Sequence, residues 1–175
     1  TSHQIDGWDD FAIVDWCREK FGLPTVLSND SDAAGLAEAR FGAGKGKRVV
    51  FYTNVGSGIG GALVIDGNLF HGGSGIASEL GQVRPGPDAR QPEETIESIA
   101  SGWGITAEVR ARLACKEIAS VDSRTAQLDA ADLLRRAGGR PDGLNTKIIA
   151  RAAEEGNRLA QEVFDGACRT FGWGI

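Results

Sequence analysis

Two neighbouring polar residues, Asn29 and Asp30, stand where a short apolar run gives way to a helical pattern. The end of a strand is a usual place for ligand-binding side chains in an α/β protein. Asp30 could accept a proton from a substrate hydroxyl while Asn29 hydrogen-bonds a neighbouring hydroxyl. The structural alternative is that both residues cap the helix, and for the pair taken alone capping is the favoured interpretation.

Two further carboxylates, Glu79 and Glu97, could hold a polyhydroxylated ligand. Glu79 follows a glycine-rich segment, where little bulk would hinder a ligand, and Gln82 could add a donor and an acceptor. An ordinary solvent-exposed carboxylate explains Glu79 equally well. Glu97 falls in the first turn of a predicted helix, where the helix dipole favours an acid, so its position has a sufficient structural explanation.

The glycine-rich segment Gly56–Gly61 lies between the strand-forming runs Val49–Thr53 and Ala62–Ile65. The glycines are therefore predicted at a tight turn between strands. Such a turn lacks bulky Cβ groups and leaves backbone N–H donors free, which a phosphate needs if it is to lie against main chain. The spacing matches neither the dinucleotide fingerprint nor the Walker loop, which requires a lysine. The alternative is a turn that serves only the topology of the sheet.

The order of predicted elements is helix, strand, helix, β-meander and then helices, which favours one α/β lobe over residues 1–175. Periodicity and turn residues predict a helix over Asp9–Phe21 ended by Gly22, a strand over Pro24–Leu27, a helix opened by Asn29–Asp32, a β segment over Arg48–Phe70 with a hairpin turn at Asp66-Gly67, a helix from Thr95 with a break at Ser101–Gly104, and helices over Ala126–Ala137, Asn145–Glu155 and Asn157–Phe171.

Composition places the chain among soluble globular proteins, because 41% of its residues are apolar and 25% are charged. A net charge of −5 without a Lys/Arg cluster argues against binding to nucleic acid or an anionic membrane. No apolar run approaches the ~20 residues of a membrane-spanning helix. We therefore expect a cytoplasmic protein that contacts neither membrane nor nucleic acid.

The cysteines Cys17, Cys115 and Cys168 are far apart and form no C-x-x-C pair. This pattern predicts neither a zinc site nor a disulfide framework, and we expect buried free thiols in a reducing cytosol. The ends of the chain lead to a separate expectation. Thr1 stands where an initiator Met would, and the last residues continue a helical pattern, so we expect a piece of a longer protein.

From near Gly7 to its end, the chain resembles the ROK family of bacterial sugar kinases and repressors. Four segments carry the resemblance, in the family's order. Ser28–Ala34 is similar to the Asn-Asp-Ala-Asn motif for sugar and base, Val55–Gly61 to the second phosphate motif, Gly72–Gly81 to the glycine-rich run into Glu-x-Gly-His, and Thr95–Gly102 to the segment after the zinc cysteines.

This resemblance implies the actin-like ATPase (ribonuclease H-like) fold, mainly its C-terminal lobe with a β-meander and packed helices. It implies an ATP- and magnesium-dependent kinase that phosphorylates a hexose or N-acylhexosamine at O6, in the manner of a glucokinase. Asp30 would be the catalytic base. The sugar hydroxyls would be held by Asn29, Glu79 and Glu97, with Gln82 within reach, and the ATP phosphates would lie near Gly56, Ser57, Gly58 and Gly60.

The chain departs from the family pattern in two respects. Gln82 replaces the histidine of Glu-x-Gly-His, and the Cys-x-Cys-Gly-x-x-Gly-Cys run is absent, so we expect no structural zinc. Nothing matches the Asp-x-Gly-x-Thr motif that binds the first phosphate and the metal. We therefore expect the N-terminal lobe to be largely missing and this piece to be inactive by itself.

An alternative function within the same family is the sugar-sensing effector domain of a transcriptional repressor, which binds sugar without phosphorylating it. Asp30 favours the kinase, because a pure sensor needs no base. The family resemblance is also consistent with a homodimer.

Overall fold

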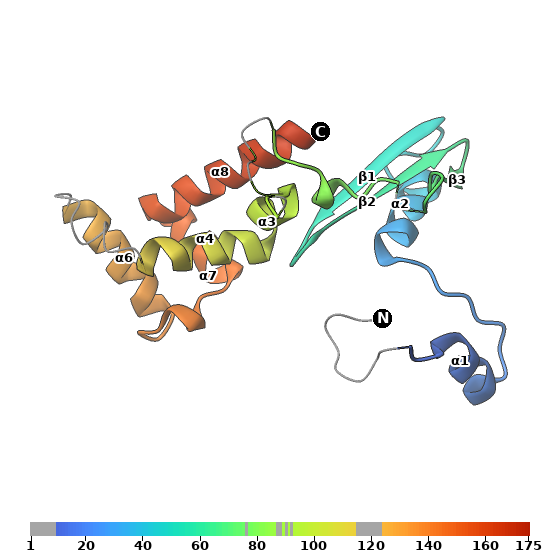
Figure 1. Cartoon of the computed structure of the whole chain (residues 1–175), viewed down its shortest axis with the longest axis horizontal. Helices are drawn as coiled ribbons and strands as arrows, with labels where there is room; N and C mark the ends of the chain where they lie inside the picture. The colour runs from blue at the N-terminus through green and yellow to red at the C-terminus, as the bar shows by residue number, and fades with distance from the viewer. Residues whose placement is uncertain (1–9, 76, 87–88, 90, 92, 115–123) are drawn as a thin grey trace.

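The computed structural model describes residues 10–75, 77–86, 89, 91, 93–114 and 124–175. Within these ranges the elements, in chain order, are α1 (Ile13–Phe21), α2 (Asp30–Phe41), β1 (Val49–Val55), β2 (Ile59–Ile65), β3 (Asn68–Leu69), the 3₁₀ turn η1 (Leu80–Gln82), α3 (Ile96–Ala100), α4 (Gly102–Ala114), α6 (Arg124–Arg136), the 3₁₀ turn η2 (Pro141–Gly143), α7 (Thr146–Glu154) and α8 (Arg158–Gly174). The molecule is elongated, with the sheet and α2 at one end and the helices from α3 to α8 at the other (Figure 1).

The sheet is an antiparallel meander in the order β1-β2-β3. Val55 pairs with Ile59, so the turn between β1 and β2 consists of residues 56–58. Ile65 pairs with Asn68 across Asp66-Gly67, whose φ angles of 50° and 78° are those of a type I′ turn. The Asp66-Gly67 turn is where the sequence predicts it, whereas the first turn is shorter than predicted, because Gly60 and Gly61 lie in β2.

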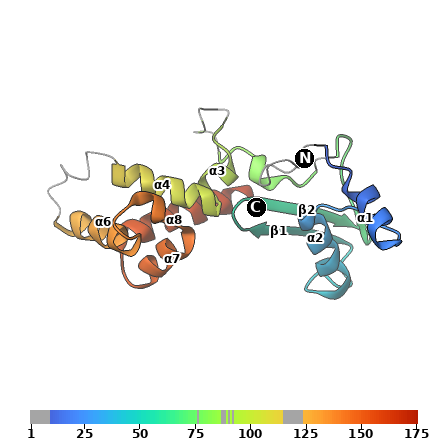
Figure 2. The same ribbon diagram turned by 90° about the horizontal axis from the view of Figure 1, so that it is seen from below.

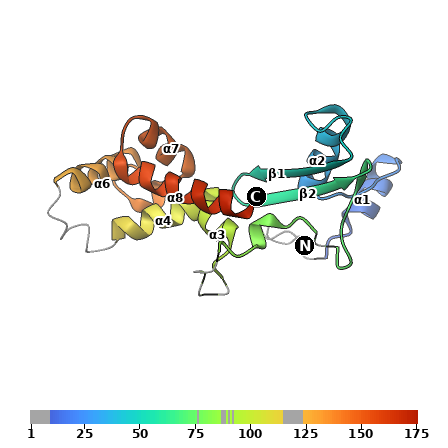
Figure 3. The same cartoon turned by 90° about the horizontal axis from the view of Figure 1, so that it is seen from above.

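Helix α2 packs on one face of the β1–β2 hairpin (Figures 2 and 3). The contact is close because Gly35 of α2 has no side chain: a Cβ there would lie 2.5 Å from the Cβ of Ala62 and 3.1 Å from that of Tyr52. This close approach brings the N-terminus of α2 to the turn between β1 and β2, where several predicted site residues lie.

The core lies in the helical part of the molecule. Ile96 of α3, Val109 of α4, Leu133 of α6 and Ile149 of α7 are fully buried there, and α8 packs against α3, α4, α6 and α7. The sheet end contributes Ile59 to the same cluster, and η1 contributes Leu80. One hydrophobic cluster therefore extends from the far helices to the turn between β1 and β2.

The predicted order of helices and the break at Ser101 are confirmed. Asn29 caps α2, as the capping interpretation predicts, since its side chain accepts hydrogen bonds from the first turn of this helix. Asn145 and Asn157, predicted as the first helical residues, are likewise caps of α7 and α8. None of the described helices combines the length and the apolar character that a membrane crossing requires.

The predicted strand over Pro24–Leu27 is wrong. The segment is an exposed connection between α1 and α2, with the side chain of Val26 92% exposed. A strand gains its hydrogen bonds from a neighbouring strand, and the meander does not include this segment. Helix α1 begins at Ile13, and the predicted first residue of this helix, Asp9, lies outside the described residues.

The cysteines are also less buried than expected. Cys17 is half-buried and Cys168 is exposed, both as free thiols, while Cys115 lies outside the described residues. The difference follows from position: α1 buries none of its residues, and Cys168 follows the buried Ala167 of α8 but does not itself face the core. The hydrophobic character of cysteine alone does not place it inside.

A network of charged side chains joins α6, α7 and the start of α8. Arg136 bonds Asp132 at 2.8 Å and Glu155 at 2.6 Å, and Asn157 donates to the same carboxylate of Asp132 at 3.2 Å. Burial by itself would raise the pKa of Asp132, but the hydrogen bonds from Arg136, Asn157 and Arg135 outweigh it and hold the pKa below its ordinary value of 3.8.

Because the pKa of Asp132 is lowered on folding, its contribution to stability is fully present above the unfolded-state pKa and is lost as the pH falls through the folded-state pKa. We expect Asp132→Asn to lower the free energy of unfolding at pH 7 by about 1–3 kcal/mol. Urea denaturation measures the difference in the free energy of unfolding between Asp132→Asn and wild type, and this difference should become smaller below about pH 4. The exposed Asp165→Asn is the control and should stay within about 0.5 kcal/mol. A gap that is constant from pH 7 to pH 3 would contradict this account.

Candidate functional site

Most of the predicted site residues line a single cavity, here called the carboxylate cavity, with a volume of about 390 Å³. It is formed by the N-terminus of α2, the turn between β1 and β2, the residue before η1 and the first turn of α3. Its lining residues are Asn29, Asp30, Ser31, Asn54, Gly56, Ser57, Gly58, Ile59, Gly60, Gly61, Glu79 and Glu97. Segments that are up to 68 positions apart in the sequence (residues 29 and 97) thus meet at one site.

Asn29 and Asp30 both cap α2 and line the cavity, so the capping interpretation and the binding interpretation are compatible. The side-chain oxygen of Asn29 accepts from the backbone N–H groups of Ser31 at 2.8 Å and Asp32 at 3.2 Å. The carboxylate of Asp30 also accepts from Ser31 N–H at 2.8 Å, through one oxygen. The amide group of Asn29 and the second carboxylate oxygen of Asp30 have no hydrogen bond among those described.

Two residues of the site, Ser31 and Asn54, were not singled out from the sequence. The hydroxyl of Ser31 donates to Asn54 Oδ1 at 3.2 Å and joins α2 to β1. Asn54 pairs in register with Gly60, and a Cβ at Gly60 would overlap the Ser31 hydroxyl and lie 2.8 Å from Asn54 Oδ1. A polar residue next to the turn in a strand of apolar and aromatic residues was the available signal for Asn54.

The carboxylate of Glu97 makes two hydrogen bonds across the site. Its Oε2 accepts from Ile59 N–H at 2.7 Å, and its Oε1 accepts from Gln82 Nε2 at 3.3 Å. Gly58 makes room for this side chain, because a Cβ at Gly58 would lie 2.6 Å from Glu97 Oε2. Gln82 lies outside the set that lines the cavity and reaches it only through Glu97. The position of Glu97 in the first turn of α3 therefore does more than complement the helix dipole.

Glu79 is exposed at the cavity, and the residues on either side of it, Ser78 and Leu80, fix its backbone. Ser78 before it has φ of 76°, a conformation that costs a non-glycine residue roughly 1 kcal/mol or more. The carbonyl of Ser78 packs where a Cβ of Gly61 would otherwise lie, and the buried Ser78 hydroxyl has no hydrogen-bond partner among the described residues. Leu80 after it is buried in the core. These contacts fix the backbone that carries Glu79.

A second, larger cavity of about 790 Å³ lies at the same turn and is here called the Trp103 cavity. Among the described lining residues, it shares only Gly56 and Ser57 with the carboxylate cavity. Its remaining lining residues are Gly102, Trp103, Thr106, Ala107, Arg110, Leu144, Asn145, Thr146 and Lys147. The sequence did not indicate this cavity, because its residues come from α4 and α7 and meet only through helix packing.

Chemically, the carboxylate cavity offers carboxylates and amides that suit a ligand with several hydroxyl groups. The Trp103 cavity offers an indole, apolar side chains and the cationic groups of Arg110 and Lys147, which suit a flat or anionic ligand. In the part of the chain that the structure describes, no three His, Cys, Asp or Glu side chains come together as a metal ion requires.

The ROK family matches the chain over residues 1–175. The chain is similar to the glucokinase of Streptomyces coelicolor, with 32% identity over an alignment of 174 residues; the match covers 93% of this chain and 52% of the relative. It is also similar to the N-acetylmannosamine kinase of Citrobacter koseri, with 37% identity over an alignment of 116 residues; this match covers 64% of this chain and 40% of the relative. The chain thus spans about half the length of the relatives it matches.

Among solved structures, the fold is similar to that of a ROK family glucokinase from Streptomyces griseus in complex with glucose and AMPPNP. The TM-score is 0.70 at 32% identity, and the match covers 90% of this chain and 48% of that one. This likeness confirms the expected fold class: the α/β, actin-like ATPase fold, represented here by a small antiparallel meander and packed helices.

The contact of Gly60 with Ser31 and Asn54 leads to a prediction. We expect Gly60→Ala to lower the free energy of unfolding by about 1–3 kcal/mol, because the added methyl group forces α2 and β1 apart. Gly73→Ala is the matched control, since a Cβ there meets nothing within 4 Å. Urea denaturation of both variants measures the difference. Equal stability of the two variants would contradict the close packing at Gly60.

Proposed function

The chain belongs to the ROK family, and we propose that the protein of which it forms part is an ATP-dependent sugar kinase. The proposed acceptor is a hexose or N-acylhexosamine, phosphorylated at O6. The observation that carries the proposal is that Asp30, a candidate base, lines the same cavity as the glycine-rich turn. The glucokinase and N-acetylmannosamine kinase relatives support both the reaction and this range of sugars.

In the proposed reaction the acceptor hydroxyl lies in the carboxylate cavity against Asp30. As the hydroxyl oxygen forms its bond to the γ-phosphorus, the bond from that phosphorus to the bridging β–γ oxygen breaks and ADP leaves. The hydroxyl proton passes to the carboxylate of Asp30. Little else needs to be supplied by side chains, because positioning and charge neutralisation carry most of the catalysis of phosphoryl transfer.

The other sugar hydroxyls are assigned to Asn29, Glu79 and Glu97. Asn29 uses its amide group, since its oxygen is engaged in capping. Glu97 uses Oε1, whose 3.3 Å bond to Gln82 is the weaker of its two contacts and the easier to exchange for a sugar hydroxyl. In this arrangement Gln82 affects the sugar site indirectly, as a neutral hydrogen-bond donor next to Glu97.

The ATP phosphates are assigned to the turn, with Gly56, Ser57 and Gly58 nearest to them. A Cβ at Gly56 would meet only the carbonyl oxygen of Gly58, at 4.0 Å, so a ligand has space beside the turn there. Contrary to the prediction from the sequence, the N–H of Gly56 itself is not free, because it donates to the carbonyl of Gly58 at 2.8 Å. Gly60, also predicted at the phosphates, contributes by making room for Ser31. The nucleoside is assigned to the Trp103 cavity, where Trp103 offers a stacking surface and Lys147 a positive charge.

Magnesium would neutralise charge on the transferred phosphates. The part of the chain that the structure describes holds no ready-made cluster of ligands for magnesium. We assign the protein contact of the metal to the lobe that carries the first phosphate motif.

We propose that residues 1–175 form one lobe of a two-lobe kinase and do not turn over by themselves. A cytoplasmic location and a homodimer remain predictions from the sequence and the family resemblance.

A substitution at Asp30 tests the catalytic assignment. In the whole protein, we expect Asp30→Asn to lower the rate of phosphorylation by about 10²–10⁴-fold, while the affinity for the sugar stays within a few-fold. The measurements are coupled ADP release with glucose and with N-acetylmannosamine, and calorimetric titration of the same sugars. Asp66→Asn, at the β2–β3 turn, is the control and should leave both unchanged.

Retained turnover in Asp30→Asn would rule out the base assignment. A wild-type protein that binds either sugar but never releases ADP would instead favour the sugar-sensing repressor function.

Metal analysis tests the zinc expectation. The described cysteines, Cys17 and Cys168, lie in different helices, and Gln82 replaces the family's histidine, so the donor set does not suit zinc. We expect less than ~0.1 zinc per chain by plasma mass spectrometry after dialysis without chelator. One zinc per chain would overturn this account of the Gln82 segment.

A further inference from the structure

The turn between β1 and β2 is bonded to the helical part of the molecule through the peptide groups of Gly102. The N–H of Gly102 donates to the carbonyl of Gly56 at 2.9 Å, and the N–H of Trp103 donates to the carbonyl of Ser57 at 3.2 Å. A Cβ at Gly102 would lie 2.9 Å from the Gly56 carbonyl oxygen, so the close approach requires glycine. The start of α4 therefore fixes two of the three residues of the turn.

Two threonine hydroxyls converge on the carbonyl of the same residue. Thr146 Oγ1 donates to Gly102 O at 2.7 Å, and Thr106 Oγ1 donates to it at 2.8 Å. The two hydroxyl oxygens are 3.1 Å apart. Gly102, Thr106 and Thr146 are called the Gly102 junction below. Its bonds run from α7 through Gly102 to the turn.

The hydrogen bonds of the two threonines differ in how far apart donor and acceptor lie in the sequence. Thr106 bonds the carbonyl four residues before it, a common local arrangement within a helix. Thr146 bonds across 44 positions of sequence and is the first residue of α7, so its bond has no local origin. Both threonines line the Trp103 cavity, whereas Gly56 and Ser57 of the turn line both cavities.

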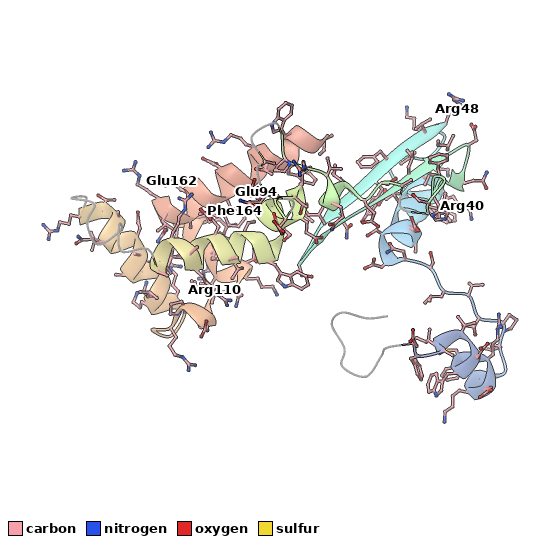
Figure 4. The ribbon with its side chains drawn as sticks, viewed as in Figure 1. Arg40, Arg48, Glu94, Arg110, Glu162 and Phe164 are labelled. Carbon is pink, nitrogen blue, oxygen red and sulfur yellow. The ribbon has the colours of Figure 1, made fainter. Side chains whose placement is uncertain are left out.

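The position of Thr146 is fixed by Arg110, which lies where α4 faces α7 (Figure 4). Its guanidinium donates to the carbonyls of Pro141, Asp142 and Leu144 at 2.9–3.1 Å. These carbonyls belong to η2 and the residue after it, directly before the cap of α7. Arg110 thus bonds the backbone through Nε and Nη2, and its side chain also lines the Trp103 cavity.

We infer that Thr146 is a positioning residue that couples the two cavities through the Gly102 junction. A ligand in the Trp103 cavity contacts the N-terminus of α7, Thr146 bonds Gly102, and Gly102 bonds the turn that forms one wall of the carboxylate cavity. Nucleotide and sugar then strengthen each other's binding, because both favour the same arrangement of the turn. This inference rests on the proposed function, since it requires that the two cavities take these two ligands.

Calorimetric titration of the whole protein with glucose, alone and with saturating AMPPNP, tests the coupling; N-acetylmannosamine replaces glucose if glucose gives no heat. In wild type, AMPPNP should raise the affinity for the sugar at least about fivefold. Thr146→Val keeps the shape and removes the hydroxyl, and it should reduce the enhancement to less than about twofold. The affinity for sugar alone should change by less than about twofold.

Three further variants make the test specific. Thr146→Ser keeps the hydroxyl and should restore most of the enhancement. Thr106→Val removes the other hydroxyl of the junction and should give a partial loss, and it replaces Thr146→Val if thermal denaturation shows that variant to be unfolded. Thr125→Val, at an exposed position of α6 outside both cavities, should behave as wild type.

The inference is overturned if wild type shows no enhancement, if Thr146→Val keeps it, or if Thr125→Val loses it equally. A wild-type protein that binds neither sugar nor AMPPNP overturns the proposed function, and the inference with it. If wild type binds both sugar and AMPPNP but AMPPNP does not raise the affinity for the sugar, the coupling is contradicted and the proposed function is not.

Discussion

The site depends on one hydrogen bond, from the backbone N–H of Ile59 to the carboxylate of Glu97. This bond joins the first turn of α3 to the first residue of β2, directly after the glycine-rich turn. It is short, and it can form only because Gly58 leaves space for the carboxylate. Without it, the turn would be held to the helical part of the molecule on one side only, through Gly102. A hydrogen bond to a charged group of this kind is worth more than an ordinary one.

The hydrophobic core determines where these polar groups lie. Ile59, Leu80 and Ile96 are all buried in one cluster, and each is next to a site residue: Ile59 to the turn, Leu80 to Glu79, and Ile96 to Glu97. Interiors are close-packed, so a shift in the core is transmitted to its immediate neighbours in the chain. The three anchors therefore hold the two carboxylates and the turn in a fixed arrangement, although Glu79 itself is exposed.

The sequence predicts well what depends on local chemistry. Helix periodicity, the Asn29 cap and the Asp66-Gly67 hairpin act within a few residues, and the structure agrees with them. The strand expected at Pro24–Leu27 is wrong because a strand requires a partner, which local preference cannot supply. Ser31, Asn54 and the Trp103 cavity were missed for the same reason. Each owes its place to contacts between segments distant in the chain, from α2 to β1 and from α4 to α7.

The glycines of the turn show how a motif can be correct while its members act for different reasons. Gly56 leaves space for a ligand beside the turn, Gly58 makes room for Glu97, and Gly60 makes room for Ser31. Only the first of these reasons concerns a phosphate directly; the other two bring acidic and polar side chains close to it. Because the two cavities share only Gly56 and Ser57, a group transferred between their ligands would have to pass at these residues. The physical basis of the motif is thus the close approach of α2, β1, β2 and α3, in which a Cβ at Gly58 would displace the Glu97 carboxylate and a Cβ at Gly60 would displace the Ser31 hydroxyl.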